Sequence, residues 1–278
     1  MMHPMEESTA SFPVLYAVLN WSMLGIGSIV AAFVWRWHRR HPPNRTACTG
    51  AIAARAWNTT HLGILLSAIV LLYLLASGSG QLFQDEQLPA ARLAIITLIY
   101  ALLVLVIAAL NRKRGITWAE GFGMGSEEVR LLGLSPLLYL AAIPFLMIVT
   151  QGYHWVLVHW LDLELTMQDA AQAITEERSW LGTGYLLVTI VAAPIYEELI
   201  FRGILFPYIT RKVGVVGGVL AVSAAFALIH AHIPSILPLF LLSCVLCLAY
   251  WRTGSLWVSI GIHALFNAIG ALAIKLLY

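Results

Sequence analysis

The chain has 278 residues, of which 60% are hydrophobic and 11% are charged, and its formal net charge is +2. Soluble domains carry about 25% charged residues, so this composition excludes an ordinary soluble protein and indicates a polytopic protein embedded in the lipid bilayer. No basic stretch is long enough, or sufficiently interleaved with aromatic residues, to indicate binding of nucleic acid, and we expect no such partner.

Eight apolar segments are suited to crossing a bilayer as helices, and they predict an all-α transmembrane bundle of about eight spans. The expected spans are 13–35, 57–77, 89–110, 134–155, 182–206, 213–232, 235–251 and 255–276. We expect residues 1–133 to form an N-terminal transmembrane region of unassigned role. Residues 134–278 would form the core that carries the chemistry, with its motifs within 197–267.

The basic residues fall mainly on one side of this predicted bundle. Twelve of the sixteen Lys and Arg residues lie in the segments 36–56, 111–133 and 207–212 and at Arg252. Loops rich in Lys and Arg stay in the cytoplasm, so the pattern predicts that both chain termini lie outside it.

Two acidic residues and an arginine lie inside an apolar run that extends from Val191 to Arg202. A charged side chain at the centre of a membrane helix costs about 2.5–3.5 kcal/mol on insertion scales. The acids Glu197 and Glu198 therefore indicate a functional site inside the membrane.

The spacing of these charges predicts different roles for the two acids. Glu198 and Arg202 are four residues apart, so their side chains can meet on one helix face and form an ion pair. Glu197 points elsewhere on the helix, which makes it the candidate base that activates water. Pro194 removes a backbone donor and can open the helix for water. The alternative is a buried ion-pair network of Glu197, Glu198 and Arg202 that only fixes helix packing.

Two later apolar helices contribute histidines. His230 follows Phe226 by four residues and could orient water, bind a metal or form a hydrogen bond between helices. His263 and Asn267 share a helix face, and their N–H groups could form a donor pair for the oxyanion of an attacked amide. A packing hydrogen bond between helices is the alternative for this pair as well.

Several well-known catalytic patterns are absent from the sequence. It contains no H-E-x-x-H, G-x-G-D or G-x-S-G motif, which zinc, aspartyl and rhomboid-type membrane proteases carry, respectively. The pair Cys244 and Cys247 lies in an apolar span without a second pair, so we interpret both cysteines as packing residues.

The motifs Glu197-Glu198-x-x-x-Arg202, Phe226-x-x-x-His230 and His263-x-x-x-Asn267 resemble those of the CAAX-protease and bacteriocin-processing (CPBP, or Abi) family. The family comprises intramembrane endopeptidases similar to the type II CAAX prenyl protease. The resemblance implies an all-helical fold around a cavity. It also implies that Glu197 activates water with help from His230, and that His263 and Asn267 form the oxyanion hole.

The resemblance leaves the metal and the substrate open. Members are conventionally classed as metalloproteases, although a metal-free glutamate mechanism has also been argued. If a metal takes part, zinc is the candidate ion, with Glu198, His230 and His263 as its ligands. The expected substrate is a membrane-associated or lipid-anchored peptide or protein. The short loops are similar to those of bacterial members, so we expect a bacterial plasma membrane protein.

Two other classes of function remain as alternatives. The buried acids and histidines could form the ion relay of a transporter. Transporters often have repeated halves with broken helices in corresponding positions, whereas the polar groups here all lie in one half. The chain could also be a scaffold without catalytic activity, for example in bacteriocin immunity. Replacing Glu197 by Gln would leave a scaffold functional and would inactivate a protease.

Overall fold

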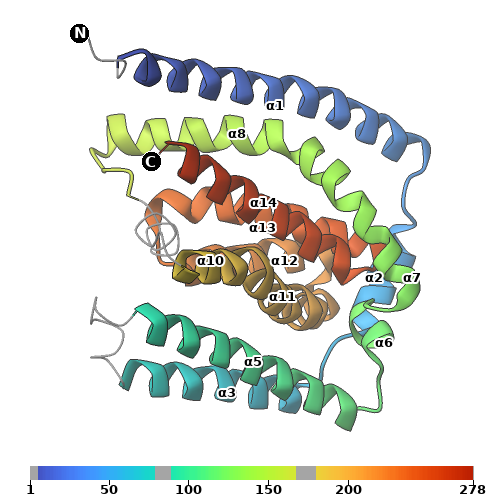
Figure 1. Ribbon diagram of the computed structural model, residues 1–278. Coiled ribbons are helices and arrows are strands. Elements are labelled where there is room, and N and C mark those ends of the chain that lie inside the picture. Colours follow the sequence, from blue (N-terminus) through green and yellow to red (C-terminus); the bar gives the residue numbers. More distant parts are fainter. Residues whose placement is uncertain (1–5, 79–88, 167–179, 278) are drawn as a thin grey trace.

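The computed structural model describes residues 6–78, 89–166 and 180–277, and these residues form an all-α structure, as the composition predicts (Figure 1). The first half contains α1 (Glu6–Arg40), α2 (Arg45–Ala54), α3 (Thr59–Gly78), α5 (Pro89–Lys113), α6 (Trp118–Phe122) and α7 (Ser126–Val129). A 3₁₀ turn, η1 (Arg130–Leu134), leads into α8 (Ser135–Trp160). The second half contains α10 (Trp180–Leu187), α11 (Ala193–Glu198), α12 (Phe206–Ile229), α13 (Ile233–Thr253) and α14 (Leu256–Leu277).

The number of helices suited to spanning a membrane is nearer six than the expected eight. Within the described residues, six helical runs are long and apolar enough to cross a bilayer. The expected spans 182–206 and 213–232 fall in one run, Trp180–Ile229, whose backbone breaks at Gly214 with φ of 79°. The expected span 57–77 corresponds to α3, whose apolar part Thr59–Leu72 is shorter than the six runs.

The helices are arranged around a central group made of α12, α13 and α14 (Figure 1). Helix α8 packs against α13 and α14 on one side, and α1 packs on the outer side of α8. Helix α5 pairs with α3 and also contacts α10 and α11. As a result, α11 lies between α14 and α5, and elements from both halves of the chain surround it.

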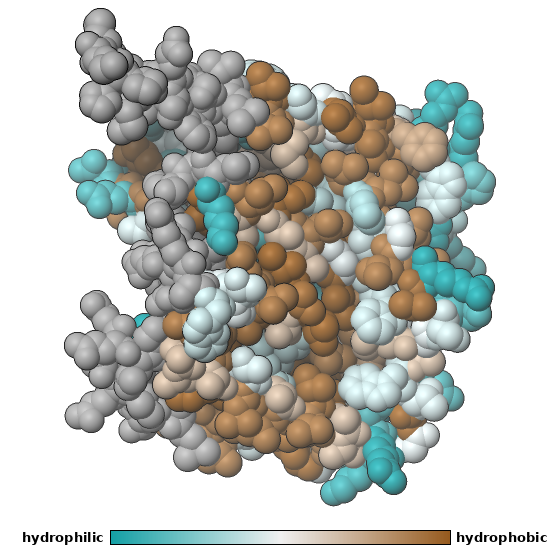
Figure 2. All heavy atoms as spheres, viewed as in Figure 1, coloured by the Kyte–Doolittle hydropathy of each residue, from teal (hydrophilic) through white to brown (hydrophobic). Residues whose placement is uncertain are grey.

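The outer surface of the bundle is apolar, as a lipid-facing surface must be. Large apolar side chains on the outer helices are exposed, for example Trp21, Ile29, Leu105 and Ile148. Figure 2 shows hydrophobic residues across the middle of the molecule, with hydrophilic residues gathered at the end where α2, α6 and α7 lie. Together with the six apolar helical runs, this surface identifies an integral membrane protein.

That hydrophilic end is closed by a tightly packed set of short helices and turns. Gly123 ends α6 with φ of 66°, and a Cβ at this position would overlap the carbonyl oxygen of Gly254. Arg55 binds the same turn, because its Nη1 donates to Gly254 O at 2.7 Å and to the hydroxyl of Tyr250 at 2.9 Å. The N-terminal region is therefore attached directly to the α13–α14 turn.

Candidate active site

The two adjacent acids lie on α11, a helix of only six residues between two π-helical turns. The first π turn is η2 (Val188–Ala192) and the second is η3 (Leu199–Leu205). Pro194 lies in the first turn of α11, directly after η2, where its missing N–H is tolerated. π turns are rare and occur frequently at functional sites, so the backbone conformation also indicates a functional site in this segment.

Glu198 and Arg202 form a fully buried ion pair, as the i, i+4 spacing predicts. Arg202 Nη1 donates to Glu198 Oε1 at 2.7 Å, and neither side chain is exposed. Arg202 Nη2 donates to the hydroxyl of Ser243 on α13 at 2.6 Å. The pair is therefore held by the neighbouring helix as well as by its own helix.

His263 on α14 lies between the two glutamates. Its Nδ1 is 2.9 Å from Glu198 Oε1, so this oxygen binds both Arg202 and His263. Its Nε2 is 3.7 Å from Glu197 Oε2. Because an ionised carboxylate can only accept hydrogen bonds, Nδ1 carries the hydrogen of the shorter contact when Glu198 is charged.

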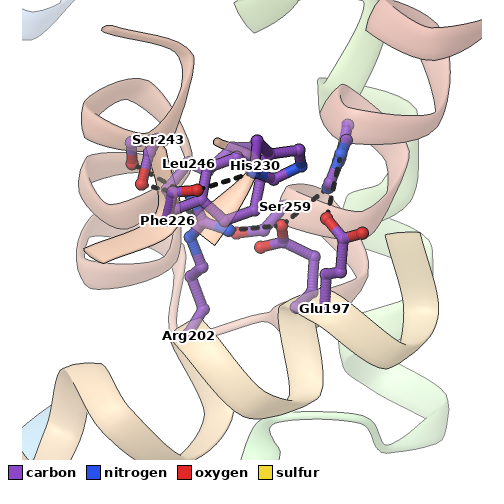
Figure 3. A network of polar contacts seen from close by, with 9 residues as sticks. Glu197, Arg202, Phe226, His230, Ser243, Leu246 and Ser259 are labelled. Carbon is purple, nitrogen blue, oxygen red and sulfur yellow. Dashed lines mark hydrogen bonds and ion pairs between the residues drawn. The ribbon is translucent and has the colours of Figure 1, made fainter. Parts of the chain in front are cut away.

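Glu197 differs from Glu198 in both exposure and bonding. Its side chain is 17% exposed, whereas that of Glu198 is fully buried. The Oε2 atoms of both glutamates are buried without a hydrogen-bond partner within the described residues, but Glu198 is held through its Oε1. Figure 3 shows Glu197 and Arg202 extending from one helical segment, with Arg202 directed toward Phe226.

The ring of Phe226 on α12 contacts Arg202 and both histidines of the site. It lies 4.6 Å from the guanidinium carbon of Arg202, a cation–π distance. Its centroid is 5.7 Å from the ring of His263 and 4.9 Å from that of His230. Phe201 makes an edge contact with it at 5.1 Å. Phe226 therefore covers the apolar side of the buried guanidinium.

His230 is half-buried at the C-terminal end of α12, where its Nδ1 lies 2.7 Å from the carbonyl oxygen of Phe226. A carbonyl oxygen only accepts, so Nδ1 carries the hydrogen and Nε2 can accept one in the neutral ring. Within the described part of the chain, the contacts of His230 with the cluster run through Phe226.

Asn267 shares a face of α14 with His263, but the two side chains face different partners. Asn267 Nδ2 donates to the carbonyl oxygen of Thr189 in the π turn η2 at 2.8 Å. This bond ties α14 to the segment that precedes the glutamates, and it uses one of the two N–H hydrogens of the amide.

The three suggested zinc ligands do not form a metal-binding set in this structure. Among the residues that the structure describes, no group of three His, Cys, Asp or Glu side chains is arranged to hold a metal ion. Glu198 Oε1 is bonded to Arg202 and His263, and Nδ1 of His230 is bonded to a backbone carbonyl. Glu198 is therefore committed to an ion pair, whereas His230 and His263 each keep Nε2 open, as a metal-binding histidine would.

Sequence reasoning missed two contributors to the site. Ser243 lies in an apolar helix that also contains buried small residues, and no residue pattern distinguishes it as the partner of Arg202. Tyr100 on α5 stacks on Tyr196, the residue before Glu197, with ring centroids 4.5 Å apart. Contacts between distant helices leave no periodic signal in the sequence of either helix.

Comparison with known proteins shows a family resemblance in the segment that carries the three motifs. Residues 178–269 match the family model described as type II CAAX prenyl endopeptidase Rce1-like, and this segment includes all three motifs. YdiL of Bacillus subtilis (strain 168), provisionally named a membrane peptidase, is 26% identical over 202 residues, which cover 73% of this chain and 80% of YdiL. No solved structure matches the chain. The segment 178–269 is thus similar to the Rce1-like type II CAAX prenyl endopeptidases, and the chain as a whole is similar to a bacterial membrane peptidase.

Proposed function

We propose that the protein hydrolyses a peptide bond of a membrane-associated or lipid-anchored peptide or protein, with water activated by Glu197. The supporting observation is the position of Glu197 Oε2, which is buried, free of hydrogen-bond partners within the described residues and 3.7 Å from His263 Nε2. Glu198 is already engaged by Arg202 and His263 and is suited to a supporting role.

The separation of Glu197 Oε2 and His263 Nε2 suits a bridging water molecule, which requires the site to open, because Oε2 is buried. Two atoms 3.7 Å apart are too far apart for a hydrogen bond to each other, but both can bond one water molecule at ~2.8 Å. Glu197 would accept a proton from this water as its oxygen attacks the peptide carbonyl carbon. When the C–N bond breaks, Glu197 would return the proton to the leaving amine, which balances the hydrolysis.

The remaining motif residues have supporting roles in this proposal. Arg202 stabilises the charge of Glu198, and Glu198 orients the His263 ring through Nδ1. We assign His263 and Asn267 to the oxyanion, because Asn267 retains a second N–H and His263 Nε2 lies near Glu197. Because Nδ1 of His263 already donates to Glu198, Nε2 can donate in that step only when the ring carries a hydrogen on both nitrogens. His230 can accept a hydrogen bond through Nε2 and so help to orient the water.

The same proposal places the protein in a bacterial plasma membrane with both termini outside the cytoplasm. The basic residues at the ends of α1 and α5 support this orientation, because Lys and Arg concentrate on the cytoplasmic side. Accessibility of single cysteines introduced near either end of α1 to a membrane-impermeant thiol reagent tests it, in a variant without the native cysteines.

The activity is tested by cleavage of a panel of membrane-anchored peptides, each supplied with and without a prenyl group. Purified wild type should cleave at least one peptide, and Glu197→Gln should lose cleavage while still folding. Glu127→Gln is the matched control, because Glu127 is exposed and its ion pair with Arg130 lies at the surface. Cleavage by Glu197→Gln at the wild-type rate would refute the role of Glu197. Loss of wild-type cleavage with a chelator, restored by zinc, would refute the metal-free form of the proposal.

A further inference from the structure

Tyr100 brings the N-terminal region to the candidate active site. It lies on α5, outside the segment 178–269 that matches the family model. Its ring stacks on that of Tyr196, with centroids 4.5 Å apart and planes inclined by 19°. Tyr196 directly precedes Glu197 on α11, so this stack is the aromatic contact next to the proposed base.

The carboxylate of Glu197 is held by fewer contacts than that of Glu198, so its position depends more on the packing of its helix. Glu198 is fixed by a 2.7 Å bond from Arg202 and a 2.9 Å contact with His263. Glu197 has a 3.7 Å contact with the same histidine, which is too long to fix the carboxylate. Its direction therefore depends on the orientation of α11, a six-residue helix whose neighbours on both sides are π turns.

The stack can supply this orientation because it joins α11 to a separate membrane helix. α5 contacts α10, η2 and α11, so it lies along the whole segment that leads to Glu197. Both phenol rings are also close enough to Glu197 for the charge of the carboxylate to act on them. Tyr100 is half-buried and stacks on Tyr196 of α11.

We propose that Tyr100 is a positioning residue for the reaction, which sets the direction of Glu197 by holding the ring of Tyr196 against α5. This inference rests on the proposed role of Glu197 as the base. Under it, the N-terminal region contributes directly to catalysis, because the helix that orients the base lies outside the family-matched segment. Loss of the stack misplaces the carboxylate relative to the water and lowers kcat, whereas substrate binding is largely retained.

The experiment compares three replacements of Tyr100 in the full-length protein, with the peptide that wild type cleaves. Tyr100→Phe keeps the stacked ring and should keep kcat within about twofold of wild type. Tyr100→Leu keeps apolar volume without the ring, and Tyr100→Ala removes both. These two should lower kcat about three- to tenfold with KM little changed, since an aromatic pair contributes about that factor. Leu98→Ala, an exposed position on the same helix, is the control.

A double-mutant cycle with Tyr196 separates positioning from a general loss of structure. If the two rings act as one unit, Tyr196→Leu combined with Tyr100→Leu should lower kcat no further than either change alone. Wild-type kcat in Tyr100→Leu, or additive losses in the double variant, would overturn the inference. Its failure is distinct from failure of the proposed function, because Glu197→Gln would remain inactive in the first case and active in the second.

Discussion

His263 Nδ1 lies 2.9 Å from Glu198 Oε1, although 65 residues separate the two in the chain. The same imidazole faces Glu197 through its other nitrogen, so one ring contacts both acids of the motif. The consecutive glutamates thereby acquire different environments. Glu198 is fixed in a fully buried ion pair, whereas Glu197 is 17% exposed and has only a 3.7 Å contact with the histidine.

Arg202 is expected to be essential for folding. Arg202→Ala would leave Glu198 buried without its cation, which costs about 3–5 kcal/mol. The apparent melting temperature of the purified protein in detergent should fall sharply. Arg130→Ala is the control, because its ion pair with Glu127 is about three-quarters exposed, and such pairs contribute about 0–1 kcal/mol. Equal melting temperatures for the two variants would contradict the importance of the buried pair.

Phe226 should matter for activity beyond its contribution to packing. Phe226→Leu keeps an apolar side chain but removes the ring that lies over the guanidinium of Arg202 and beside both histidines. Phe206→Leu is the matched control, since Phe206 is an equally buried phenylalanine on the same helix.

Both Phe-to-Leu changes should lower stability by about 1–3 kcal/mol, and only Phe226→Leu should also reduce the rate of peptide cleavage at temperatures where both variants are folded. A comparable loss of rate in Phe206→Leu would show that the effect is one of general packing.

Two glycines with the same left-handed backbone should respond differently to alanine. Gly115 and Gly123 have φ of 67° and 66°, so either substitution costs about 1–2 kcal/mol of backbone strain. A Cβ at Gly115 meets open space, whereas one at Gly123 overlaps Gly254 O. Gly123→Ala should therefore destabilise the protein by about 3–5 kcal/mol in total. Thermal unfolding of both variants tests this, and similar melting temperatures would argue against the close contact.

The local part of the site could be predicted from the sequence. The ion pair of Glu198 and Arg202 follows from helical spacing, and the all-α fold follows from the apolar segments. The number of spans is nearer six than the expected eight, since the expected span 57–77 contains only a shorter apolar helix. The expected spans 182–206 and 213–232 lie in one helical run, but the chain reverses at Gly214, because the ring of Phe226 lies against Phe201 and Arg202.

The non-local part of the site was not accessible to the same reasoning. Helical periodicity assigns residues to a face of their own helix, but it does not define how neighbouring helices are rotated against each other. The hydrogen bond of Asn267 with a carbonyl of η2 depends on a π turn, and no residue type in the sequence predicts that turn. The same limit applies to Ser243 and to Tyr100, whose partners lie on other helices.

The complete burial of Glu198 and Arg202 has a consequence for the population of molecules in a cell. A copy in which either charge lacks its partner has an unpaired ion in the buried interior and is unstable. Unstable copies are removed by cellular proteases. The copies that persist are therefore mainly those in which this ion pair has formed.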